Sequence, residues 1–112
     1  MIRAEVHVIV PEGIDDPARP SGGNTYDRRV CHGLTALGWS VREHAVPGAW
    51  PRPSADGHAA LAHAVQRIPD GAVLLLDGLI ASAAPEALVP HAPRLRQVVL
   101  VHMPLGLSLI HI

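Results

Sequence analysis

Short apolar runs recur along the chain, and each is a candidate strand. They are VHVIV (6–10), SVREHAV (40–46), AVLLLD (72–77) and QVVLVHM (97–103). Segments with helical spacing separate these runs, and strands that alternate with helices are typical of βαβ units and a parallel sheet. The pattern predicts an α/β fold with a Rossmann-like parallel sheet of four strands and helices on both faces.

The polarity of the four runs predicts their order in the sheet. Three of them are almost continuously apolar, as strands covered on both faces are, whereas 40–46 carries Arg42, Glu43 and His44. The second strand is therefore expected at an edge, which gives the order 2-1-3-4 with a topological switch between the first and third strands. Ligands bind such sheets outside the carboxyl ends of the strands at the switch, where the loop 11–24 begins.

Helical periodicity is clearest after this loop. Asn24 is placed to cap the first helix, with Asp27 in a near-capping-box position, and Gly38 is placed to end it. A second helix is expected over 55–68, and a third, short one begins at Pro85 before later prolines break it. The apolar positions on one face of the first helix are Tyr26, Val30, Leu34 and Leu37, with Cys31 beside them.

Composition excludes several classes of partner. The 112 residues, 48% of them hydrophobic, are enough for one globular domain. Nine Lys and Arg stand against ten Asp and Glu, so the chain has no basic field for a polynucleotide. Aromatic residues make up only 3%, too few for a surface that stacks single-stranded bases. We expect no nucleic-acid partner.

Cysteine and histidine positions narrow the expected chemistry further. Cys31 is the only cysteine, which excludes an internal disulfide and a Cys-based zinc cluster and fits a reducing compartment. The first apolar run is broken by His7 and ended by Pro11, so it is too short to cross a bilayer. His58 and His63 are off same-face helical spacing, so no metal site and no cofactor are predicted. We expect a cytoplasmic domain without a transmembrane segment.

The stretch RPSGGNTYDRRV (19–30) places two glycines between the first strand and the first helix. A helix N-terminus offers unpaired N–H groups and partial positive charge, and glycines let a phosphate approach the backbone closely. The loop lacks the Lys and Ser/Thr of a P-loop, and it is not a G-x-G-x-x-G fingerprint. Two interpretations remain open: Gly22 and Gly23 bind a phosphate, or they form a tight turn into the helix.

The last six residues, LSLIHI (107–112), do not continue the pattern. They resemble, residue for residue, the translation of the transposon end sequence in sequencing-library adapters. This resemblance implies that 107–112 is a non-native tail and that 1–106 is an incomplete domain. The fourth strand would then be an exposed edge, and the chain marginally stable or prone to aggregation. The alternative is a genuine short fifth strand starting at Leu107.

Three segments carry a resemblance to a known family. PSGGNTYDRRVCHGLTALGWSVREHAVPGAWPRP, IPDGAVLLLDGLIASAAPEALVP and VVLVHMPLG resemble the N-terminal domain of family 4 (group 1) glycosyltransferases of the GT-B fold. The likeness extends to Gly106. Its most specific pieces are the Ser-Gly-Gly-Asn loop, Asp77 and Gly78 closing the third strand, and His102 closing the fourth.

The resemblance implies an activity and a set of site residues. The parent enzyme would transfer a sugar from a nucleotide-sugar donor to a hydroxyl of a small-molecule or glycan acceptor, with retention. A missing C-terminal domain would hold most of the donor, so this half of a GT-B fold alone would be inactive. His102 would be the catalytic residue. The substrate-binding residues implied are Ser21, Gly22, Gly23, Asn24 and Asp77.

Other interpretations of these residues stay open. Asp77 binds acceptor hydroxyls, or it holds its own loop by accepting a backbone N–H two residues on. His102 either faces the sugar or packs at a strand end, and Cys31 is expected as a buried small residue rather than a nucleophile. The alternative function is a small doubly wound module that binds a nucleotide or phosphate without catalysis.

Overall fold

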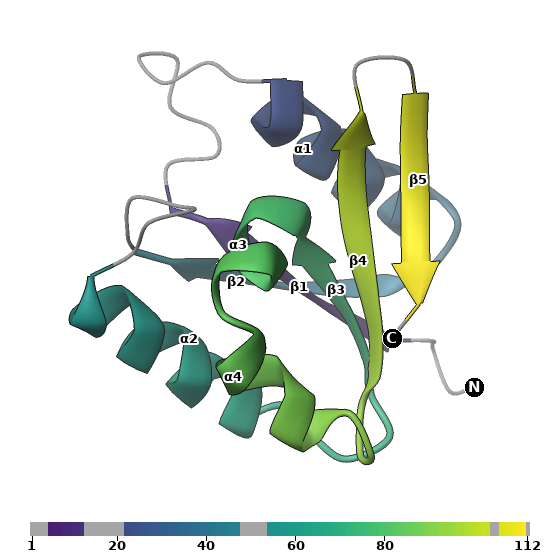
Figure 1. Ribbon diagram of the computed structural model, residues 1–112. Helices are drawn as coiled ribbons and strands as arrows, with labels where there is room; N and C mark the ends of the chain where they lie inside the picture. Colours follow the sequence, from purple (N-terminus) through teal and green to yellow (C-terminus); the bar gives the residue numbers. More distant parts are fainter. Residues whose placement is uncertain (1–4, 13–21, 48–53, 104–105, 112) are drawn as a thin grey trace.

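The central sheet of the computed structural model has four parallel strands, as the alternation of apolar runs predicts. Residues 5–12, 22–47, 54–103 and 106–111 are described. The order β2-β1-β3-β4 confirms the predicted topology, with the topological switch between β1 and β3 (Figure 1). The parallel strands are β1 (Glu5–Pro11), β2 (Ser40–Val46), β3 (Val73–Asp77) and β4 (Arg96–Met103).

A fifth strand, β5 (Gly106–His111), pairs antiparallel with β4 and places Leu109 opposite Leu100. The expectation that β4 is the edge of the sheet is therefore wrong. The backbone groups on the outer side of β4 find hydrogen-bond partners in the last residues of the chain, whose composition favours an extended conformation. The adapter origin inferred for 107–112 stays a prediction.

Helices cover both faces of the sheet, as predicted. α1 (Gly22–Ala36) packs on one face, where it shares a core with Val6, Val8 and Val10 of β1. Ile9 of β1 points to the opposite face and joins a larger core with the other helices. On that face lie α2 (Ala55–Gln66), α3 (Gly78–Ala83), α4 (Pro85–Leu88) and the 3₁₀ turn η1 (Val89–His91).

The helical segments follow the sequence prediction with one addition. α2 lies within the predicted range 55–68, and Pro85 opens α4 at its first turn, as expected. α3 was not anticipated, because its six residues are too few to show a helical period. None of the helices within the described ranges is long and apolar enough to cross a membrane.

The end of α1 confirms one prediction and overturns another. Gly38 has φ +96°, the left-handed conformation that ends many helices. Leu37 does not lie on the buried face as expected, since it is 79% exposed. The helix already ends at Ala36, so the turn carries Leu37 outward, and Trp39 packs against the core on the α1 side instead.

Two glycine substitutions in α1 and its terminal turn should have opposite effects. Gly38→Ala should lower the free energy of unfolding by about 1–2 kcal/mol, because an L side chain is strained in the left-handed region. Gly33→Ala should raise it by up to about 1 kcal/mol, since a Cβ at this helical position meets nothing within 4 Å. Urea denaturation measures both; a destabilised Gly33→Ala or an unchanged Gly38→Ala would contradict the assignment of this helix end.

Candidate functional site

The glycine pair opens α1 at the carboxyl end of the sheet. Gly22 and Gly23 are the first two residues of the helix, and Asp27, one turn further on, is hydrogen-bonded to Asp77 at the end of β3. The contact of Asp27 with Asp77 therefore joins the second turn of α1 to the carboxyl end of β3, next to the topological switch. Figure 1 shows α1 lying across this face of the sheet. The predicted contact of Gly22 and Gly23 with a phosphate stays a prediction. Ser21 lies outside the described residues.

Asn24 is not the N-cap of α1. The helix begins at Gly22, so Asn24 is its third residue, and the capping prediction is wrong. The apolar pattern does not indicate that the helix starts at Gly22, because glycines have no side chain that could contribute to a helical periodicity. The implied contact of Asn24 with substrate stays a prediction.

Asp27 and Asp77 form a buried pair of carboxyl groups behind the glycine turn. Their exposed fractions are 0% and 2%. Asp77 Oδ1 accepts a hydrogen bond from the backbone N–H of Leu79 at 2.8 Å and so caps α3. This contact confirms the interpretation in which Asp77 holds its own loop; its contact with an acceptor stays a prediction.

The two carboxyl groups share a proton at neutral pH. Burial raises the pKa of Asp27 to about 9, and the hydrogen bond to Asp77 and the charge of Asp77 act in the same direction, against the opposing charge of Arg28. Asp27 is thus the protonated partner, which donates to the Asp77 carboxylate. The pair carries one negative charge where two ionised groups would carry two.

Sequence reasoning assigned Asp27 to a capping box and missed this pairing. One signal was present, since Asp27 precedes the buried Cys31 by four residues and therefore shares its side of the helix. An acidic residue on a buried helical face needs a partner, but its identity depends on how α1 lies over β3. The sequence carries no local mark of that arrangement.

Next to this pair, an ion pair ties α1 to the edge strand. Arg28 Nη1 lies 2.7 Å from Glu43 Oε1 on β2. Cys31 is buried close by, and burial first, then the neighbouring Glu43, raises the pKa of its thiol to about 11. The thiol is therefore protonated at neutral pH, in agreement with its interpretation as a buried small residue rather than a nucleophile.

His102 lies on β4 near the same end of the sheet. Leu100 is paired in register with Asp77, and His102 follows it by two residues, opposite Leu107 of β5. The backbone thus carries His102 beyond the end of β3, on the side of the carboxyl edge. The structure describes the backbone of His102 but not its side chain. The catalytic role of His102 stays a prediction.

The fold defines the class of this protein as a doubly wound, Rossmann-like α/β domain. Within the described residues, no group of three or more His, Cys, Asp and Glu side chains is placed to hold a metal ion. Comparison of the chain with protein-family models, with curated proteins and with solved structures gives no match.

Proposed function

We propose that this chain is the acceptor-side, N-terminal domain of a glycosyltransferase of the GT-B fold. The whole enzyme transfers a sugar, with retention, from a nucleotide-sugar donor to an acceptor hydroxyl. The proposal rests on the family resemblance of the sequence, and the doubly wound sheet is compatible with it. A second domain holds most of the donor, so the 112-residue chain alone is inactive.

The observation that most supports this function is the position of the glycine pair. Gly22 and Gly23 begin α1 at the carboxyl edge, so the unpaired N–H groups of its first turn are available to a diphosphate there. Cleavage of a glycosyl–phosphate bond leaves negative charge on the diphosphate. Fixed N–H donors stabilise that charge where it develops, without a metal ion.

The shared proton of Asp27 and Asp77 favours an anion at this edge. Two ionised carboxylates close to the start of α1 would repel a diphosphate, whereas the proton-sharing pair carries a single charge. The pair also links the first turns of α1 to the end of β3 and to α3. The N–H groups of the glycine turn are thereby held in place before the ligand arrives.

Replacement of Gly23 by Val tests the diphosphate site. In the 112-residue chain, inorganic pyrophosphate should shift the amide NMR signals of Gly22 and Gly23 in a saturable manner. Gly23→Val should weaken this binding about tenfold, because a branched side chain obstructs the approach to the backbone. Gly33→Val makes the same change later in α1, where a Cβ meets nothing within 4 Å, and should bind as the unaltered chain does.

The alternative is a module that binds a nucleotide or phosphate without catalysis, favoured by the same glycine turn, which needs no second domain. The genomic reading frame after Gly106 separates the two. A second Rossmann-like domain with paired glutamates supports the transferase, whereas a stop codon supports the module. Sugar transfer by the 112-residue chain alone would contradict the division of the site between two domains.

A further inference from the structure

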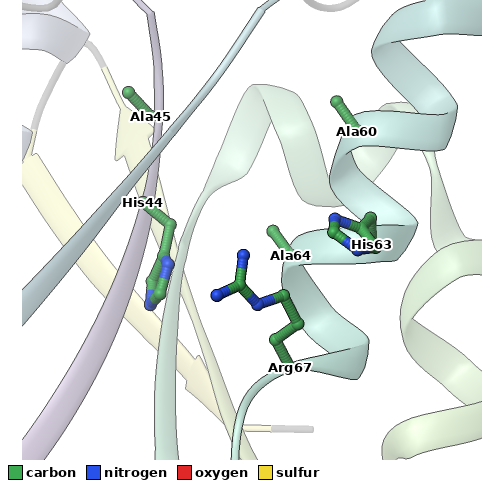
Figure 2. Close-up of a pocket in the computed structure, with 6 residues that line it drawn as sticks. All are labelled: His44, Ala45, Ala60, His63, Ala64 and Arg67. Atoms are coloured by element: carbon green, nitrogen blue, oxygen red, sulfur yellow. The ribbon is translucent and has the colours of Figure 1, made fainter.

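A second concave site lies between the edge strand β2 and helix α2, on the face of the sheet opposite α1. It is a pocket of about 350 Å³ (Figure 2). This volume is at the lower end of the range for sites that enclose small molecules. The residues that line it are His44, Ala45, Ala60, His63, Ala64 and Arg67.

The polar lining of this pocket consists of basic side chains. The guanidinium of Arg67 extends toward the imidazole of His44, while His63 stands on α2 (Figure 2). The remaining lining residues are alanines, which leave the space open. A pocket walled by one guanidinium, two imidazoles and methyl groups is chemically suited to an anion.

The acidic residues nearest in sequence to these cations, Glu43 and Asp70, are already paired with Arg28 and Arg94. Glu5 Oε1 lies 2.8 Å from Nε of Arg42 and 3.3 Å from Nε2 of His7. Across the described ranges, Arg67 takes part in none of the ion pairs, unlike Arg28 and Arg94. The charge of Arg67 is thus available to a ligand in the pocket.

A hydrogen bond to His7, which in turn faces a carboxylate, fixes His44 in this wall. His44 Nε2 lies 2.9 Å from Nδ1 of His7, whose Nε2 faces Glu5. The carboxylate favours a proton on Nε2 of His7, so Nδ1 of His7 accepts from His44, and the second nitrogen of His44 remains basic. Burial first, then the nearby His7, Arg67 and Arg42, lowers the pKa of His44. A bound anion would offset this positive field and let His44 take up a proton.

We propose that the pocket between β2 and α2 binds the phosphate group of a small phosphorylated molecule, held by the guanidinium of Arg67 and by hydrogen bonds that the imidazoles of His44 and His63 donate. The planar guanidinium binds two phosphate oxygens at once, and the imidazoles reach the tetrahedral group from other sides. The volume leaves room for a small organic moiety beside the phosphate. This site is distinct from the glycine turn at the start of α1 and does not depend on the function proposed for it.

The imidazole NMR signals of His44 report occupancy of the pocket directly. Titration of the 112-residue chain with inorganic phosphate at constant ionic strength should shift them in a saturable manner and raise the pKa of His44. Arg67→Gln should weaken binding at least about tenfold, the usual scale for loss of one charge-assisted contact. Arg29→Gln removes the same charge from an exposed position on α1 and should leave binding within about twofold.

Further variants keep the proposal falsifiable. Ala60→Leu fills the pocket without a change of charge and should also abolish the response of His44. Gly23→Val should leave this response intact, which separates the pocket from the proposed diphosphate site. The proposal is overturned if Arg67→Gln binds phosphate as the unaltered chain does, or if chloride produces the same shifts. Tighter binding of acetate than of phosphate would overturn the assignment to a phosphate.

Discussion

Asp27→Asn should stabilise the chain at alkaline pH and remove most of the pH dependence of its free energy of unfolding. The unaltered chain loses stability as the pH rises, because the fold requires a proton on Asp27 that the unfolded chain releases. An amide at this position remains neutral at every pH. Its NH₂ group can still donate to the carboxylate of Asp77.

The sign of this effect follows from the two pKa values of Asp27. In the unfolded chain the group titrates near its ordinary value of 3.8, whereas in the fold it keeps its proton up to about 9. Between these values the folded chain binds more protons than the unfolded one. The stability that Asp27 contributes is therefore fully present below about pH 4 and falls by up to about 1.4 kcal/mol per pH unit until the folded group titrates.

Urea denaturation at several pH values between 5 and 9 measures this slope. Asp56→Asn makes the same chemical change at an exposed position in the first turn of α2 and should keep the slope of the unaltered chain. If Asp27→Asn shows the same loss of stability with rising pH as the unaltered chain, the proton does not reside on the Asp27–Asp77 pair.

The order of the parallel strands was predictable because the polarity of a strand's residues indicates whether both of its faces are covered by helices. β1 and β3 are central and buried on both faces, so they need apolar side chains at successive positions. β2 has one neighbouring strand and a half-exposed surface, which tolerates Arg42 and Glu43. The position of the glycine turn followed from this order, since the loop after β1 must leave the sheet at its carboxyl edge.

Features that depend on distant partners were not predictable in the same way. Asp77 ends β3, and the sequence shows this position. Its hydrogen bond to the N-terminus of α3 and its hydrogen bond to Asp27 depend on how α3 and α1 pack against the sheet. In the sequence, His44 indicates only an edge strand. Its pocket forms because α2 brings Arg67 across from a separate part of the chain. Sequence periodicity describes each element alone, so it leaves such contacts unassigned.

Arg94 is another residue whose importance the sequence does not show. Its guanidinium donates to the backbone carbonyl of Val65 at 2.9 Å and to that of Ile68 at 2.5 Å, at the end of α2. Nη1 also lies 3.0 Å from Oδ1 of Asp70, and Nε donates to Nδ1 of His91 at 2.8 Å. One side chain thus satisfies carbonyls at a helix terminus and joins α2 to the segment before β4.

Arg94→Ala should lower the free energy of unfolding by about 2–3 kcal/mol, because it leaves these carbonyls without a charged donor. Asp70 is 82% exposed on its side chain, so Asp70→Asn should cost less than about 0.5 kcal/mol. Arg94→Lys should recover only a minor part of the loss, since an ammonium cannot reproduce the fork of the guanidinium. Arg96→Ala, at an exposed position two residues further on, is the matched control and should be nearly neutral. Urea denaturation measures the free energy of unfolding of the four variants. If Arg94→Ala loses no more stability than Asp70→Asn, the exposed ion pair accounts for the effect and the carbonyl contacts do not.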